Sequence, residues 1–145
     1  MDYNDFEEIV LKKKEEKPIW FEMDSLEIAS IDEIEGVEYE LKVKLPIEYS
    51  EFVRNYGGGY FAFTKVYSAD ASSEWNIVEN NKKAEFNEKF IAVSDNGAGD
   101  YYGFEVIEGI CNSVVSVYDH DQNMVAETKY QDFYEFLCEI GLRMT

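Results

Sequence analysis

The sequence predicts a single α+β domain, with helices at both ends packed on a mainly antiparallel or mixed sheet. Helical periodicity marks the two ends of the chain, whereas apolar and polar residues alternate in the middle. The connections between strand-like segments are short, which favours antiparallel pairing. The 145 residues fit one domain spanning 1–145, and they show no repeat or linker.

Two helices are expected in the N-terminal third. Residues 3–17 carry a narrow apolar stripe on a charged segment, and Pro18 ends it. Ser30 and Glu33 then form a capping-box pattern, in which each side chain can bond the backbone amide of the other. A short helix should follow, weakened by Gly36.

The clearest helix begins at Leu45-Pro46, because proline suits the first helical position. Its apolar residues fall at i, i+3, i+4 and i+7, namely Tyr49, Phe52, Val53 and Tyr56. Three glycines, Gly57-Gly58-Gly59, can end the helix and turn the chain directly into a strand.

The period changes to two over 60–67, which predicts a strand buried mainly on one face. Similar strand signals occur at 90–94, 101–107 and 114–118. The intervening residues 69–88 are polar and predict a loop with a helical turn.

A second capping-box pattern at 128–131 predicts the start of the last helix, which Gly141 should end. We expect seven large apolar side chains in the core: Phe52, Val53, Phe61, Phe63, Phe104, Phe133 and Leu137.

The net charge of −18 is concentrated in two stretches. Residues 18–41 hold eight acids and residues 90–128 hold seven, with no Lys or Arg in either stretch. If the two stretches meet, one face repels nucleic acid and anionic lipid and attracts a cationic protein. The alternative is a solubilising coat.

The first residues are acidic and lack the order of a signal peptide, and no apolar run is long enough to span a bilayer. A cytoplasmic protein is therefore expected. Cys111 and Cys138 form no paired motif and are interpreted as reduced core residues.

Residues 95–100, Asp-Asn-Gly-Ala-Gly-Asp, lie between two strand signals. Their glycines do not open a helix, so the segment is no dinucleotide fingerprint, and Asn96-Gly97 instead predicts a hairpin turn. The turn is either purely structural or also presents Asp95, Asp100 and Tyr101 to a partner.

Asp119 and Asp121 begin a pattern like a calcium loop, but Met124 and Tyr130 stand where glycine and a bidentate glutamate are needed. With His120 as the single histidine, no metal site and no cofactor are expected. No nucleophile elbow is present, and nothing in the sequence identifies an active site.

Most aromatic residues are expected in the core, but Tyr60 and Tyr101 are the best candidates for exposed interface anchors. The candidate partner-binding residues are therefore Tyr60, Asp95, Asp100, Tyr101, Asp119 and Asp121.

Residues 45–58, residues 90–100 and the closing aromatic-rich helix together resemble the SUKH superfamily. This superfamily includes bacterial immunity proteins for polymorphic toxins and fungal cell-wall assembly regulators. The common pattern is a Leu-Pro helix ending in Asn-Gly-Gly, a later Gly-Asp turn between strands and a C-terminal helix. This chain departs from it at Tyr56, which stands between Asn55 and the glycines. The resemblance covers about 30–141 and implies an α+β fold and a non-enzymatic binding protein.

Charge and resemblance together suggest a cytoplasmic immunity protein, or antitoxin, that binds and neutralises a cognate secreted toxin through its acidic surface. The expected partner is a basic nuclease domain, with no direct binding to nucleic acid or membrane. The alternative is an intracellular regulatory scaffold of the cell-wall-regulator type. The oligomeric state is left open.

Overall fold

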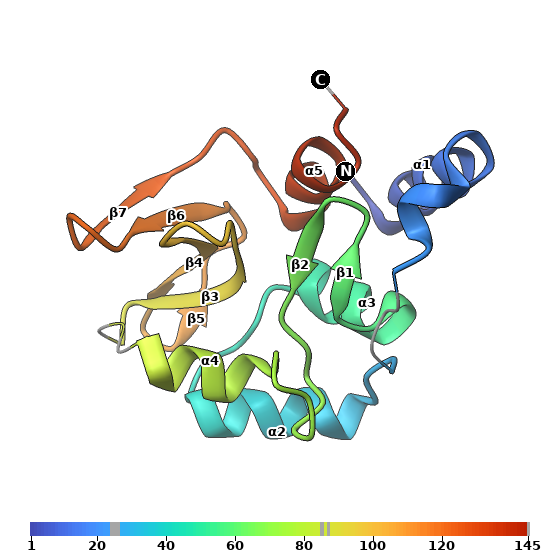
Figure 1. The fold of residues 1–145 in the computed structure, drawn as a ribbon. Helices are drawn as coiled ribbons and strands as arrows, with labels where there is room; N and C mark the ends of the chain where they lie inside the picture. The colour runs from blue at the N-terminus through green and yellow to red at the C-terminus, as the bar shows by residue number, and fades with distance from the viewer. Residues whose placement is uncertain (24–26, 85, 87, 145) are drawn as a thin grey trace.

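The computed structural model describes residues 1–23, 27–84, 86 and 88–144. These residues form five α-helices and one antiparallel sheet of seven strands, which confirms the predicted single-domain α+β class. Figure 1 shows α2 and α4 on one side of the sheet and α1 and α5 on the other.

Helix α1 spans Tyr3–Glu16, as predicted, and its apolar stripe buries Phe6 and Val10. A short 3-10 turn, Pro18–Phe21, follows the end of the helix. Pro18 therefore marks the boundary that the sequence predicts.

Helix α2 spans Ile31–Leu41 and begins with the predicted capping box. The Glu33 amide donates to Ser30 Oγ at 3.1 Å, and the Ser30 amide donates to Glu33 Oε1 at 3.0 Å. Helix α3 spans Ile47–Tyr56, with Pro46 as its N-cap rather than its first helical residue.

The predicted strand over 60–67 is instead a hairpin of β1 (Gly59–Phe61) and β2 (Thr64–Val66). Ala62 adopts a left-handed conformation, with φ of 51°, so the chain reverses there. The predicted core position of Phe63 is wrong, because the turn carries this side chain out of the sheet and leaves it 46% exposed. The other six predicted core residues are buried.

Helix α4 spans Ile77–Ala84, a full helix where the sequence predicts only a helical turn. Its buried Asn81 side chain bonds the backbone at position 92, accepting from the Ala92 amide at 2.8 Å and donating to the Ala92 carbonyl at 2.9 Å. The register of the adjoining strands shifts between Ala92 and Ser94. Asn81 therefore satisfies backbone groups at this irregularity and ties α4 to the sheet.

The other strands are β3 (Phe90–Asp95), β4 (Asp100–Ile107), β5 (Ile110–Cys111), β6 (Ser116–Asp119) and β7 (Met124–Glu127). Three of them, β3, β4 and β6, match the sequence signals. The short strands β5 and β7 were not predicted. The order is β1-β2-β3-β4-β6-β7, with β5 paired to β4, so β7 lies at one edge.

The last helix begins later than predicted. Asp132, not Thr128, is the N-cap of α5 (Phe133–Phe136), and its carboxylate accepts from the Glu135 amide at 2.9 Å. The Thr128 hydroxyl instead donates to the Val115 carbonyl at 2.8 Å, which ties the connection after β7 to the sheet. A π-helical turn continues α5 and ends at Gly141, the predicted end.

Helices α1, α3 and α5 contribute aromatic rings to one buried cluster. Phe6 stacks on Tyr134 with ring centroids 4.7 Å apart, and Phe52 packs edge-on against Phe61 at 5.1 Å and Phe133 at 5.8 Å. This cluster anchors the β1–β2 hairpin and fixes its place beside β3.

Candidate partner-binding surface

The β3–β4 turn (96–99) and the β6–β7 turn (120–123) lie at the same end of the sheet, because β4 pairs antiparallel with both β3 and β6. This end gathers most of the candidate residues, and the β1–β2 hairpin lies beside it. Among the four candidate carboxylates, Asp95 alone forms an ion pair within the described residues.

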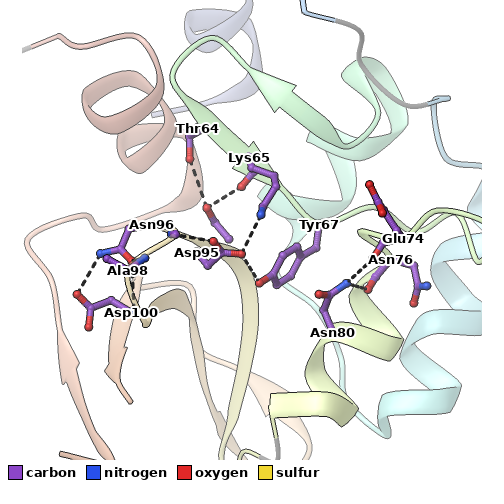
Figure 2. Close-up of polar contacts among 12 residues, drawn as sticks. Thr64, Lys65, Tyr67, Glu74, Asn76, Asn80, Asp95, Asn96, Ala98 and Asp100 are labelled. Atoms are coloured by element: carbon purple, nitrogen blue, oxygen red, sulfur yellow. Dashed lines mark hydrogen bonds and ion pairs between the residues drawn. The ribbon is translucent and has the colours of Figure 1, made fainter. Parts of the chain in front are cut away.

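The β3–β4 turn is held by Asn96, as the Asn-Gly signal predicts. Asn96 Oδ1 accepts from the amides of Ala98 at 2.8 Å and Asp100 at 3.2 Å, and Asn96 Nδ2 donates to the Asp100 carboxylate at 3.0 Å (Figure 2). Gly97 and Gly99 have φ of 74° and 101°, a conformation that glycine adopts without strain. The turn therefore sets the position of Asp100.

Asp95 is neutralised within the protein (Figure 2). Its Oδ2 accepts from the Tyr67 hydroxyl at 2.7 Å and lies 3.2 Å from Lys65 Nζ, while Oδ1 accepts from the Gly97 amide at 2.9 Å. Burial alone would raise the pKa of the Asp95 carboxyl, but Tyr67, Lys65 and Gly97 outweigh it and hold that pKa below its ordinary value. Asp95 joins the β1–β2 hairpin to the turn.

Asp100 and Asp119 are directly opposed on β4 and β6. Their side chains leave the sheet on the same face, about 5 Å apart at Cβ, an arrangement that is unfavourable for like charges. Asp121 follows in the next turn, where its amide donates to Asp119 Oδ1 at 2.9 Å. We call Asp100, Asp119 and Asp121 the acidic end. Within the described residues, no ion pair joins any of the three to a cation.

The two candidate tyrosines differ in exposure. Tyr60 is 40% exposed, and its ring packs edge-on against Trp75 at 5.0 Å, with Lys65 Nζ at 5.0 Å from the Trp75 ring. Tyr101 is partly buried and less exposed than Tyr60, and its ring packs edge-on against Phe86 at 5.0 Å. Tyr60 is therefore the more accessible of the two candidate anchors.

Tyr60 and Asp95 line one groove of about 330 Å³ between the β1–β2 hairpin and the β3–β4 turn, together with Phe63. Sequence reasoning missed Phe63 and Trp75 as parts of this surface. Trp75 offered a usable signal, since a large aromatic in a polar segment is unusual. Exposed aromatic rings in a groove beside the β3–β4 turn can supply apolar contact area to a bound protein surface.

The two acid-rich stretches do not merge at this end. The segment after α2 bonds the β4–β5 turn, where the Lys44 amide donates to the Gly109 carbonyl at 2.7 Å. Since a strand rises about 3.3 Å per residue, the eight residues of β4 put that turn about 23 Å from Asp100. The molecule therefore has two separate acidic regions, one on α2 and one at the acidic end.

The two cysteines are buried and not disulfide-bonded, as interpreted from the sequence. Burial, aided by Glu38, raises the pKa of the Cys111 thiol to about 12. Burial, aided by Asp132 and Glu135, raises the pKa of the Cys138 thiol to about 11. Neither thiol is a reactive thiolate at neutral pH.

Among residues 1–23, 27–84, 86 and 88–144, no group of His, Cys, Asp or Glu is arranged to hold a metal ion. Over the same residues, no helix is long and apolar enough to cross a membrane.

Comparison with known proteins identifies one family. A comparison with characterised protein sequences gives no significant match. The sequence model of the family SUKH_6, described as SMI1-KNR4 cell-wall, matches residues 31–137, which is most of the chain and includes the acidic end. The chain therefore belongs to the SUKH_6 family, within the SUKH superfamily that its motifs resemble.

Proposed function

We propose that this protein is a non-enzymatic immunity protein that binds and neutralises a cognate basic toxin domain, with the acidic end as the steering surface. Membership of the family supports a binding protein of the immunity or cell-wall-regulator type. The hypothesis that the partner is a basic toxin domain rests on the negative charge of this chain.

The observation that carries the proposal is the opposed pair Asp100 and Asp119. Directly opposed like charges weaken a sheet by about 0.2–1 kcal/mol, so the pair works against the stability of the fold. A cationic partner would remove this repulsion on binding and would gain two charge-assisted contacts. Residues that oppose folding stability are often kept for function.

The mechanism that follows is electrostatic steering and then occlusion. The uncompensated carboxylates raise the rate of encounter with a basic surface, and the neighbouring Tyr60 supplies apolar contact area once the surfaces meet. The bound protein would cover the active site of the toxin or its approach to nucleic acid. No catalytic step by this chain is required.

The test begins with a toxin encoded beside the gene for this protein, purified and mixed with three-site variants. Asp100→Asn, Asp119→Asn and Asp121→Asn together should slow association about tenfold at low salt, and less at high salt because salt screens the attraction. The matched control changes three exposed acids to Gln, Glu8 and Glu15 of α1 and Glu22 just after the 3-10 turn. Figure 1 shows α1 on the opposite side of the molecule from β6 and β7.

Equal slowing by both three-site variants would show a general charge effect and contradict a specific acidic end. Stable binding to an endogenous cellular protein, with no toxin gene nearby, would favour the regulatory scaffold instead.

A further inference from the structure

A second surface lies between α2 and α4, well away from the acidic end. The two helices pack side by side (Figure 1), and with the segment that precedes α4 they enclose a groove of about 520 Å³. We call it the α2–α4 groove. Four α2 residues spaced i, i+3, i+4 and i+7 line it, namely Glu33, Gly36, Val37 and Glu40.

The floor of the groove is apolar and held in place. Val37, Ala69 and Ile77 are buried beneath it. The Ser68 amide donates to the Trp75 carbonyl at 2.8 Å, and the Ile77 amide donates to the Ser68 carbonyl at 2.8 Å. A floor fixed by backbone bonds is preorganised for a ligand, so little ordering is needed on binding.

The rim of the groove is anionic. Glu33, Glu40 and Glu79 line it, and Lys82, the one cation among the described residues that line it, lies 3.6 Å from Glu40. Among the described residues, no ion pair involves Glu33 or Glu79. The rim therefore keeps an uncompensated negative charge.

Two further features leave the groove open. Tyr39, which also lines it, is 82% exposed, so its ring face is available to a ligand. Gly36 lies inside α2, and a Cβ placed there would meet no atom within 4 Å. Glycine inside a helix costs about 1 kcal/mol relative to alanine, and nothing in the packing requires it here.

We propose that the α2–α4 groove receives an arginine side chain from a basic segment of the protein partner. The apolar floor would cover the methylene stem, the carboxylates of Glu33 and Glu79 would accept from the guanidinium, and Tyr39 would stack on its plane. The inference rests on the proposed function for the identity of the partner, and the chemistry of the groove selects arginine over lysine.

The test is a titration of the isotope-labelled protein with the capped peptide Gly-Arg-Gly-Arg-Gly at physiological salt, followed by NMR. The amide resonances of Gly36, Ala69 and Ala71 should shift and saturate. The same peptide with citrulline in place of arginine should weaken binding at least tenfold, because citrulline keeps the shape and loses the charge. The lysine peptide should also bind more weakly.

Two variants examine the groove itself. Gly36→Gln fills it and should reduce the affinity about tenfold while the helix is retained, since glutamine favours a helix more than glycine does. Glu79→Gln should reduce the affinity about threefold. Its matched control, Glu35→Gln, removes one exposed acid from α2 outside the groove and should leave the affinity unchanged.

The groove proposal would be overturned if Gly36→Gln bound the arginine peptide with unchanged affinity. It would also be overturned if the peptide shifted only the amide resonances of Asp100 and Asp119. Toxin binding is measured separately. If the toxin binds and the arginine peptide does not, the proposal for the α2–α4 groove is refuted and the proposed function stands. If the arginine peptide binds and no toxin does, the proposed function is refuted and the groove proposal stands.

Discussion

Asp95 and Asp100 flank the same short turn, yet their carboxylates have neighbours of opposite charge. Asp95 is surrounded by the Lys65 ammonium and the Tyr67 hydroxyl, whereas Asp100 faces a second carboxylate, Asp119. The Asp95 carboxylate strengthens the join between the hairpin and the sheet, whereas the Asp100 carboxylate weakens the pairing of β4 with β6. Counting acids along a sequence therefore overestimates the charge that a partner meets.

The largest effect should come from Gly103→Ala, which disturbs both regions together. Gly103 lies on β4, and a Cβ there would come within 1.9 Å of the Ile91 carbonyl oxygen. Because the obstructing atoms are backbone, β3 and β4 would have to separate, at a cost of about 3 kcal/mol. Denaturant unfolding measures this. The matched control, Gly36→Ala, should raise stability by up to about 1 kcal/mol.

Asp95→Asn should destabilise the protein by about 2 kcal/mol, because it removes the charge that Lys65 and Tyr67 stabilise. The rate of association with the toxin should change little. If Asp95→Asn left the stability unchanged and slowed association, Asp95 would belong to the interface. The conclusion that Asp95 serves the fold and Asp100 serves the partner would then be wrong.

The pH dependence of stability tests whether the Asp95 carboxylate stabilises the fold in its charged form. The pKa of Asp95 is lowered in the folded state, so its contribution to stability is present above the unfolded value of about 3.9 and is lost as pH falls through the folded pKa. The stability difference between the wild-type protein and Asp95→Asn should therefore be constant near pH 6 and shrink below about pH 4. Urea titrations at several pH values measure it. A difference that grows on acidification would contradict the assignment.

Local signals predicted the elements whose causes are local. The capping box of Ser30 and Glu33 fixes the start of α2, and the apolar stripe of α3 fixes its buried face. Phe63 was misplaced because alternation continues unchanged through a two-residue turn, and Ala62 gives no glycine-like signal of reversal. At the last helix, Thr128 and Asp132 each begin a capping pattern. Asp132 prevails because the buried run from Phe133 follows it directly.

The sequence predicted which residues belong to the candidate site, but not which of them contact one another. The pairing of Asp100 with Asp119 depends on strand register, and the neutralisation of Asp95 depends on a lysine in a distant hairpin. Neither fact is encoded within a short window of sequence. The groove beside Gly36 likewise requires α4 to form and to pack against α2.

The smallest expected effect is on stability at the acidic end, where Asp100→Asn or Asp119→Asn should each raise the free energy of unfolding by about 0.5 kcal/mol. Either change removes the same repulsion, so the double variant should gain little beyond one single variant, and the two effects should not add. Asp121→Asn, in the turn after β6, is the control and should show no such coupling. A double-mutant cycle in urea at low salt measures the coupling. Additive gains would mean that the two carboxylates do not repel each other. The acidic end would then cost the fold no stability, and the proposal that these residues are kept for a partner would lose its support.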